Sequence, residues 1–495
     1  MPAAHVSGAA SELAPDWLTC PQDVNTLDAK LWAQDVARGA AGELEVSGIG
    51  VRELKEQFGT PLYVVSEDDF RARARAFKQA FDDAFSSLCG GVDVYYAGKA
   101  FLSVEIARWV AQEGLRLDTC SGGELAVAAR AGIPGENLGL HGNNKSDAEI
   151  HRALDMGLGR IVVDSLDELA RVGAIAAARG EMANVMLRLT PGVHAHTHEF
   201  IATAHEDQKF GLSMAADPGQ EQDRTEHDAG APAQSVGSPA AQAVAAALAH
   251  ESINLLGLHC HIGSQIFEPE GFALAAERLL TFVAEVRDDH GVDLHELDLG
   301  GGYGIAYTEA DTPRPPAELA QAMAAVVRAA TERLGIPVPR ISIEPGRAIA
   351  GPSTFTLYST GTRKTVQVDV DGGGSRPRRY VSVDGGMSDN ARPVLYDADY
   401  SAVLASRVTE AAPIISRVVG KHCESGDIVV RNVYLPEDIE AGDLLAVPAT
   451  GAYCWALSSN YNYVARPPVV AVRGGEARLI IRGETEDDLL ARDLG

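Results

Sequence analysis

A strand followed by a helix recurs through the first half of this chain at a nearly constant interval. Candidate strands, rich in β-branched and aromatic residues, begin near Val92, Leu115, Asn137, Arg160 and Asn184, so that successive strands start 22 to 24 residues apart. Strands that alternate with helices at this spacing pair in parallel, because each helix carries the chain back to the edge where the last strand began. The repeat therefore predicts an α/β fold built on a parallel sheet.

The helical segments between these strands carry start and stop signals. Each begins with a serine and, three residues later, a glutamate, the pattern of a capping box in which the glutamate reaches back to the start of the helix. A glycine stands where each helix is expected to end. The pairs are Ser121 and Glu124, Ser146 and Glu149, and Ser165 and Glu168, and the glycines are Gly132, Gly157 and Gly180.

Three further strands are expected at 255–259, 296–299 and 340–344, with amphipathic helices near 269–289 and 316–334. Eight strands over about 250 residues match the count and size of a (β/α)8 barrel, the TIM-like α/β barrel. The alternative is an open doubly wound sheet. That fold has fewer strands and usually a phosphate-binding fingerprint at its first turn, which this chain lacks.

The sequence changes in character on both sides of the predicted barrel. Residues 1–20 are rich in Ala, Ser and Pro and are expected to be disordered. A strand at 61–65 leads to Ser66, which is expected to cap a helix from Glu67 to about Phe85. Within the barrel, residues 217–242 are rich in Pro, Gly, Ala, Gln and Asp and are expected to form a disordered insertion.

After Arg347 the chain consists of short β-type runs separated by glycine-rich turns. These runs lie at 366–370, 379–383, 427–430, 444–447, 469–472 and 478–482. They predict a C-terminal β-sandwich or β-barrel domain that the N-terminal strand at 61–65 joins. The expected domains are therefore a barrel over 66–342 and a β domain formed by 21–65 and 343–495.

Charge and composition exclude several classes of function. The formal net charge is −27, which repels phosphate backbones and argues against a nucleic-acid partner. No apolar run approaches the roughly 20 residues that span a bilayer, and the N-terminus lacks the features of a signal peptide. The six cysteines include no CxxC pair, so we expect neither a metal site nor a disulfide framework. We also expect the protein to reside in a reducing cytoplasm.

Chemically active residues stand at the C-terminal ends of the predicted strands, where barrel enzymes place their active sites. They are Lys99, Asp118, Arg188, His261 with Ser264, Gly300–Gly302, and Glu344-Pro345-Gly346-Arg347. Taken singly, each has an ordinary explanation, such as a surface lysine, a satisfied histidine or a glycine turn. Together they describe a site for pyridoxal 5'-phosphate.

In such a site each residue type has a task. Lys99 would bond covalently to the cofactor. The amides of Gly300–Gly302 would approach the phosphate, because no side chains intervene. Glu344 would keep the pyridine nitrogen protonated, His261 would stack on the ring, and Arg347 would lie near the phosphate and the substrate.

The motifs that carry these residues resemble the diaminopimelate decarboxylase family, in the alanine-racemase-like fold group that also holds ornithine and arginine decarboxylases. The likeness covers about residues 45 to 490. The matching stretches are Tyr96-Ala97-Gly98-Lys99-Ala100, Gly257 to Gln265, Glu344-Pro345-Gly346-Arg347, Arg392-Pro393-Val394-Leu395-Tyr396, Cys423-Glu424-Ser425-Gly426-Asp427 and Gly451-Ala452-Tyr453. The tail and the insertion depart from the family pattern but lie outside these motifs.

The resemblance implies roles for residues beyond the barrel. Cys423 would be the second catalytic residue, a proton donor opposite Lys99, and Glu424 would meet the distal ammonium of the substrate. Arg347, Arg392 and Tyr396 would hold its distal carboxylate, while Tyr453 would contact cofactor and substrate. In this family Cys423 and Glu424 enter the partner chain's site, which implies a homodimer with shared active sites.

The implied reaction is decarboxylation of meso-2,6-diaminopimelate to L-lysine and carbon dioxide, the last step of lysine biosynthesis. A racemase of the same fold is disfavoured, because by resemblance it places an arginine where this chain has Glu344. An ornithine- or arginine-type decarboxylase has aspartate at the position of Glu424. The non-enzyme alternative is a regulatory homologue that has lost the cofactor. The presence of Lys99, Glu344 and Cys423 argues against it.

Overall fold

The computed structural model describes residues 11–192, 209–215 and 237–495, which form two compact units. We call Arg73–Gly304 with Arg314–Gly346 the barrel unit. The described residues of Met1–Ala72, Ile305–Pro313 and Arg347–Gly495 make up the β unit. The segment Ile305–Pro313 thus leaves the barrel between its last two strands and belongs with the β unit.

The barrel unit is a closed ring of eight parallel strands, as the sequence predicts. In chain order they are β5 (Val92–Ala97), β6 (Arg116–Thr119), β7 (Leu138–Leu140), β8 (Arg160–Val163), β9 (Ala183–Thr190), β11 (Ile253–His259), β12 (Glu296–Asp298) and β13 (Arg340–Ile343). Strand β13 pairs with β5 and β8 pairs with β9, so the sheet has no open end among these eight strands. A short ninth strand, β10 (Leu212–Ser213), adds to β9 in parallel.

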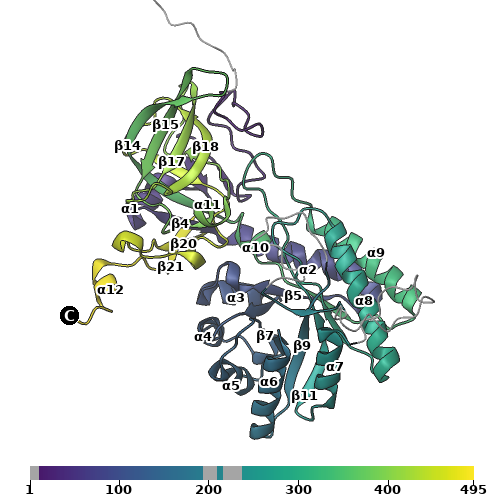
Figure 1. Cartoon of the computed structure of the whole chain (residues 1–495). Coiled ribbons are helices and arrows are strands. Elements are labelled where there is room, and N and C mark those ends of the chain that lie inside the picture. Colours follow the sequence, from purple (N-terminus) through teal and green to yellow (C-terminus); the bar gives the residue numbers. More distant parts are fainter. Residues whose placement is uncertain (1–10, 193–208, 216–236) are drawn as a thin grey trace, which may run out of the picture. The chain divides into compact units, whose positions relative to one another are not determined.

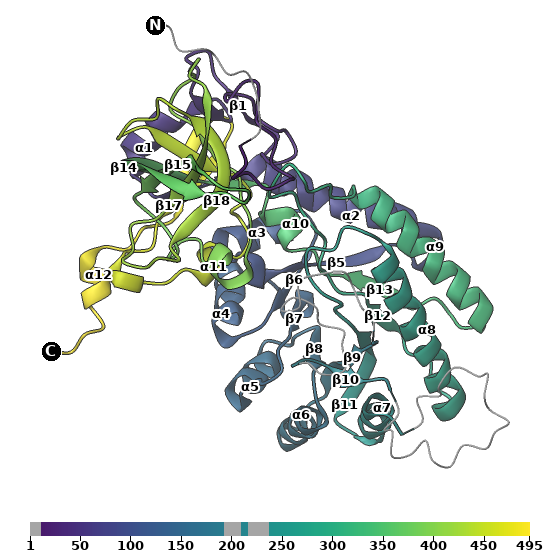
Figure 2. The ribbon, with the colours of Figure 1, turned by 45° about the horizontal axis from the view of Figure 1, so that its top comes forward.

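Helices surround this ring of strands (Figure 2). They are α3 (Val104–Gln112), α4 (Gly122–Ala131), α5 (Asp147–Asp155), α6 (Leu166–Arg179), α7 (Pro239–Ala249), α8 (Glu270–His290) and α9 (Pro316–Leu334). Helix α2 (Glu67–Cys89) enters the barrel unit from the β unit and begins as predicted, with Ser66 Oγ accepting a hydrogen bond from Asp69 N at 3.1 Å. No helix in the described ranges is long and apolar enough to cross a membrane.

The predicted serine caps all form, but the glutamates behave differently from one helix to the next. The reciprocal capping box exists at Ser146, where Glu149 also bonds the serine amide. Glu124 instead accepts from the amide of Cys120, one residue before the Ser121 cap. Glu168 likewise reaches the amide of the residue that precedes its capping serine. The sequence spacing therefore predicts all three serine caps correctly, but it predicts the hydrogen-bond partner of the glutamate in only one of the three helices.

Two predicted disordered segments need correction at their ends. Helix α7 begins at Pro239, inside the expected insertion 217–242, because Ser238 caps it and proline suits the first helical position. Residues 217–236 of that insertion lie outside the described residues. In the expected tail 1–20, residues 11–20 are tied down: Ser11 N donates to Tyr434 Oη at 2.8 Å, and Glu12 pairs with Arg376 at 2.9 Å. Residues 1–10 lie outside the described part of the chain.

The β unit is built on one large, mainly antiparallel sheet (Figure 1). Its strands are β4 (Leu62–Ser66), β14 (Thr354–Asp369), β15 (Ser375–Val383), β16 (Val403–Leu404), β17 (Pro413–Val419), β18 (Ile428–Pro436), β19 (Leu444–Val447), β20 (Val469–Arg473) and β21 (Glu476–Ile481). Strand β4 lies between β14 and β20, which confirms that the N-terminal strand joins this domain. Strands β16 and β17 were not predicted.

Smaller elements complete the β unit. They are β1 (Val36–Arg38), β2 (Leu44–Val46), β3 (Ile49–Gly50), α1 (Val51–Phe58), α10 (Arg347–Ala350), α11 (Arg392–Tyr396), η6 (Trp455–Leu457), η7 (Tyr461–Tyr463) and α12 (Glu486–Leu490). The first three strands form a separate small sheet, whose buried Leu44 and Val46 share one apolar core with Val64 of β4, Phe355 of β14 and Val470 of β20. This core holds the N-terminal segment onto the C-terminal domain.

Candidate active site

Lys99 follows the first barrel strand almost directly. Strand β5 ends at Ala97, and Lys99 lies in the short 3-10 turn η1 (Gly98–Ala100) that comes next. This turn is fixed to the end of the last strand, because Ala97 N donates to the Pro345 carbonyl at 3.1 Å. The lysine side chain itself is exposed. An accessible amine on a fixed turn can capture a carbonyl compound.

Glu344 stands just after β13, with its carboxylate buried. His259 Nε2 lies 2.9 Å from Glu344 Oε1, and His141 Nε2 lies 3.5 Å from the same oxygen. Burial raises the pKa of Glu344, lowers the pKa of His141 to about 4 and lowers the pKa of His259 well below its ordinary value. Both imidazoles are therefore neutral near pH 7: His259 bonds the Glu344 side chain directly, His141 lies beside it, and neither ring adds a neutralising charge.

Arg160 supplies the fixed positive charge inside the barrel. Its Nη2 lies 2.7 Å from Asp298 Oδ2 and 3.4 Å from Asp118 Oδ1, and its Nη1 donates to Ser342 Oγ at 2.9 Å. The guanidinium stacks over the Tyr95 ring at 3.5 Å. Burial still raises the pKa of Asp118 to about 7. The interior is therefore rich in acid groups and favours a ligand that brings a positive charge.

The glycine loop after β12 is pressed against neighbouring backbone. A Cβ atom at Gly300 would lie 2.3 Å from the carbonyl oxygen of Cys260, and one at Gly301 would lie 2.1 Å from the carbonyl oxygen of Glu344. Only glycine fits such contacts, and a loop without side chains leaves room for a bulky anion such as a phosphate. The shape of the loop and the acid-rich interior thus fit a cofactor that carries a phosphate and a ring nitrogen.

Not all three predicted amides are open to such an anion. Gly300 N donates to Asp298 Oδ1 at 2.7 Å, and Gly301 N donates to His261 Nδ1 at 3.3 Å. The first amide therefore belongs to the barrel interior, and the second orients the histidine ring. The Gly302 amide is therefore the strongest candidate of the three for binding the phosphate.

The remaining predicted cofactor residues of the barrel lie on β9 and in the loop after β11. His261 is half-buried, and burial lowers the pKa of its ring well below the ordinary value, so a neutral ring is available for stacking. Ser264 is half-buried in the same loop. Arg188 is buried 3.8 Å from Asp164 and lies over the Phe210 ring at 4.5 Å.

The barrel unit brings several of the predicted residues into one electrostatic environment. The Lys99 ammonium lowers the pKa of Asp118 and of Glu344, against burial, which raises both. It also lowers the pKa of His261, in the same direction as burial. A lysine, two carboxyls and a neutral histidine therefore act on one another at the ends of four different strands.

In the β unit, Arg347 opens helix α10 among aromatic side chains. Its Nη1 donates to Tyr307 Oη at 2.5 Å, and its guanidinium lies 4.6 Å from the ring centre of Tyr453. Gly346, the residue before it, is buried. Arg347 and Tyr453, which were predicted to share a ligand, are thus direct neighbours.

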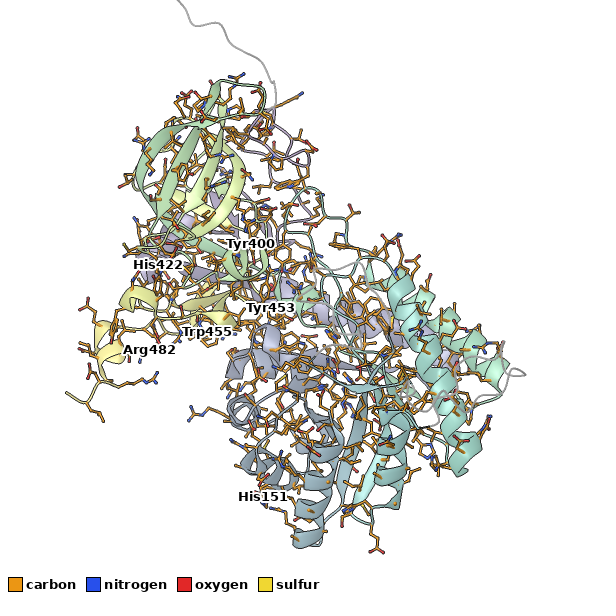
Figure 3. The ribbon with its side chains drawn as sticks, in the orientation of Figure 1. His151, Tyr400, His422, Tyr453, Trp455 and Arg482 are labelled. Carbon is orange, nitrogen blue, oxygen red and sulfur yellow. The ribbon has the colours of Figure 1, made fainter. Side chains whose placement is uncertain are left out.

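Arg392 opens helix α11 and is also buried. Its guanidinium lies 4.3 Å from the ring centre of Tyr307, and its Nη1 donates to Tyr400 Oη at 2.6 Å. Tyr396, the hydroxyl expected beside it, lies half-buried at the far end of α11. Tyr400 and Tyr453 are labelled in Figure 3, both in the β unit.

Cys423 and Glu424 lie in the hairpin loop between β17 and β18, and both are exposed. The base of this loop is tied down, because Asp427 Oδ2 accepts from His422 N at 2.8 Å and from His422 Nδ1 at 2.9 Å. The backbone of Cys423 is also held, since its amide donates to Asn462 Oδ1 at 3.0 Å. The loop therefore presents a thiol and a carboxylate to the outside on a fixed frame.

Sequence reasoning missed several residues that the structure adds to these clusters. They are His141, Arg160, His259 and Asp298 in the barrel unit, and Tyr307 and Tyr400 in the β unit. His141 directly follows β7, so the rule that selected the other strand ends could have found it. His259 and Asp298 are the last residues of β11 and β12, so the same rule applies to them, whereas nothing in the local sequence marks Arg160, Tyr307 and Tyr400.

Comparisons with known proteins find matches to both parts of the chain. The family model for the pyridoxal-dependent decarboxylase pyridoxal binding domain matches residues 67–229 and 230–351. The model for the C-terminal sheet domain of the same decarboxylases matches residues 353–451. Together the two models cover most of the chain. The first spans the barrel strands and the second spans most of the C-terminal sheet.

Individual relatives are similar over nearly their full length. The diaminopimelate decarboxylase of Mycobacterium tuberculosis H37Rv is 49% identical over 94% of this chain and 98% of its own. That of Bacillus subtilis 168 is 43% identical over 92% of this chain and 95% of its own. The crystal structure of the M. jannaschii diaminopimelate decarboxylase in complex with L-lysine matches with a TM-score of 0.82, at 30% identity over 94% of this chain and 98% of that one.

Proposed function

The chain belongs to the pyridoxal-dependent decarboxylases, and we propose that it converts meso-2,6-diaminopimelate to L-lysine and carbon dioxide. This activity is the last step of lysine biosynthesis. Relatives that bear the name of this activity match almost the whole chain at 43 to 49% identity, which supports the substrate. The cofactor is pyridoxal 5'-phosphate.

One observation carries the class of reaction. Glu344 is a buried carboxyl group bonded to neutral His259 and close to neutral His141, in a barrel whose first strand leads to Lys99. An anion at the pyridine nitrogen keeps that nitrogen protonated, whereas an arginine there would not. The acid-rich interior around Arg160 therefore suits decarboxylation better than racemisation.

Each barrel residue has a distinct proposed task toward the cofactor. When bound, the cofactor supplies an electron sink for the pair of electrons left by departing carbon dioxide. Lys99 would bond to it covalently, Glu344 would hold a proton at its ring nitrogen, and His261 would lie against its ring. The backbone around Gly302, with Ser264, would receive its phosphate. Asp118, Arg188, Pro345 and Gly346 would complete the cofactor pocket.

The residues of the β unit would act on the substrate. Cys423 Sγ would hold the proton that replaces the departing carboxylate on the α-carbon, and Glu424 would bind the distal ammonium. Arg347 and Arg392 are buried among tyrosines, and no carboxylate in the described ranges pairs with Arg392. A distal carboxylate would supply the missing anion, with Tyr396 adding a hydroxyl.

We also propose that the enzyme is a homodimer in the cytoplasm. Cys423 and Glu424 are exposed on one hairpin loop, whereas proton transfer to carbon requires a site closed to water. A partner chain that receives this loop would close the site. All six cysteines are free, which suits a reducing compartment.

The substrate is tested by measuring carbon dioxide release by the holoenzyme from meso-diaminopimelate, ornithine, arginine and lysine. We expect release from diaminopimelate alone at a physiological rate. Preferential release from ornithine or arginine would overturn the proposed substrate and leave the decarboxylase class intact.

A further inference from the structure

Arg392 is the first member of a closed ring of hydrogen bonds in the β unit. Its Nη1 donates to Tyr400 Oη at 2.6 Å, and Tyr400 Oη lies 3.6 Å from Cys454 Sγ. Cys454 Sγ donates to Asn390 Oδ1 at 3.5 Å. The ring closes on Arg392 itself, because its own backbone amide donates to Asn390 Oδ1 at 3.3 Å.

The direction of each bond in this ring follows from the chemistry. Since an arginine can only donate, Tyr400 must accept from Arg392, and its own hydrogen is then free to go to Cys454. Burial raises the pKa of Tyr400 well above its ordinary value and the pKa of Cys454 to about 11. Hydroxyl and thiol therefore both keep their hydrogens at neutral pH. The thiol hydrogen is left for the amide oxygen of Asn390 at 3.5 Å, which is nearer than its other acceptor, the Ala452 carbonyl at 3.8 Å.

The ring is also rigid. Asn390 and Tyr400 are each 1% exposed and Cys454 is fully buried, so water does not compete for these bonds. Tyr400 packs edge-on against Tyr307 with ring centres 5.0 Å apart, and Arg392 lies over Tyr307. The guanidinium of Arg392 is thus fixed at one end by the ring of hydrogen bonds and on one face by the aromatic side chain of Tyr307.

We propose that Asn390, Tyr400 and Cys454 are positioning residues that hold the Arg392 guanidinium for a carboxylate on the distal carbon of the substrate. The inference rests on the proposed function, in which Arg392 binds that carboxylate. A bidentate contact between guanidinium and carboxylate depends on the orientation of the planar fork. The hydrogen-bonded ring sets that orientation, and so sets the preference for an amino acid with a second carboxylate.

The test compares two competitive inhibitors of the holoenzyme that differ by one carboxylate. L-Lysine, the product, retains the distal carboxylate of the substrate, and cadaverine lacks it. Tyr400→Phe keeps the aromatic ring and removes the hydroxyl. We expect it to weaken inhibition by lysine roughly tenfold and to raise the KM for diaminopimelate by a similar factor, since one charge-assisted bond is lost. Inhibition by cadaverine, the kcat and the absorption spectrum of the bound cofactor should stay unchanged.

Two further variants separate positioning from general damage. Cys454→Ser keeps a donor and an acceptor and should retain most of the lysine affinity, whereas Cys454→Ala should lose it as Tyr400→Phe does. Tyr380→Phe is the matched control, because Tyr380 Oη also accepts from an arginine, Arg417, at 3.5 Å. It should change neither inhibition constant. The two Cys454 variants also test the inference if Tyr400→Phe does not fold.

A double variant shows whether Tyr400 acts through Arg392. In an Arg392→Ala background, Tyr400→Phe should have no further effect on lysine inhibition. Equal loss of lysine and cadaverine affinity, no loss of either, or a full effect without Arg392 would overturn the inference. Failure of the proposed function would appear earlier, as a parent enzyme that neither turns over diaminopimelate nor binds lysine. An Arg392→Ala variant with unchanged lysine affinity would refute the assigned role of Arg392.

Discussion

At the scale of single residues, the barrel interior around Arg160 combines more acid groups than this arginine can balance alone. Arg160 pairs directly with Asp298 and lies near both Asp118 and Glu344. The two neighbouring histidines are neutral and add no charge. The site is therefore prepared for a cationic ligand before the ligand arrives, and a protonated pyridine ring of the cofactor would meet that requirement.

The covalent anchor is the most specific prediction at this scale. Borohydride reduction of the holoenzyme followed by peptide mapping should place the reduced cofactor on Lys99, because this amine is exposed on the fixed turn after β5. Label on Lys145, whose amine is buried against Glu168 at 2.9 Å, would contradict the assignment.

Asp118 predicts a pH dependence of stability in the cofactor-free enzyme. Burial raises its folded-state pKa to about 7, so between pH 5 and pH 7 the folded protein holds a proton that the unfolded chain has lost. This contribution to the free energy of unfolding therefore falls as pH rises. Asp118→Asn removes it, so the variant should gain on the order of 2 kcal/mol relative to the parent between pH 5 and pH 7.

Urea unfolding of parent and variant at the two pH values checks this prediction. A difference between the two proteins that does not change with pH would show that Asp118 ionises normally in the fold.

At the scale of elements, local signals in the sequence predict the barrel well. The strands, the serine caps and the stop glycines depend on residues within about four positions along the chain, so the sequence alone is enough to predict them. The site is predictable where it follows the same logic, as with Lys99 and Glu344 at strand ends. Arg160 escapes prediction because its partners come from distant segments, and nothing else in a strand of hydrophobic residues indicates a buried arginine. Tyr400 escapes it because its contacts with Tyr307 and Cys454 exist only in the folded chain. Strand β17 was missed for a similar reason, since its pairing with β15 and β18 decides it.

The glycine loop after β12 gives a prediction for an element. Gly301→Ala should weaken binding of pyridoxal phosphate to the apoenzyme by roughly tenfold or more, because the new methyl group would meet the Glu344 carbonyl oxygen at 2.1 Å and displace the loop. Gly123→Ala is the matched control, since a Cβ there meets nothing closer than 3.7 Å. Fluorescence titration with the cofactor measures both. Equal affinities in the two variants would rule out a role for the loop.

At the scale of the whole molecule, the proposed dimer shares its sites between chains. Lys99→Ala and Cys423→Ala should each be inactive alone, while an equimolar mixture should regain up to about a quarter of the parent activity, because about half of the dimers are then hybrids and each hybrid contains one intact site of two. The activity should appear at the rate of subunit exchange, followed by differently tagged chains. Proven exchange without recovered activity would place Lys99 and Cys423 of one chain in the same site.

We propose that this enzyme replaces one carboxylate of meso-diaminopimelate with a proton. The most direct measurement is mass and chiral analysis of the product formed by the holoenzyme in D2O. We expect L-lysine with a single deuterium on carbon, and one carbon dioxide for each lysine formed. Deuterated diaminopimelate of altered configuration, without carbon dioxide, would instead identify a racemase and contradict the account.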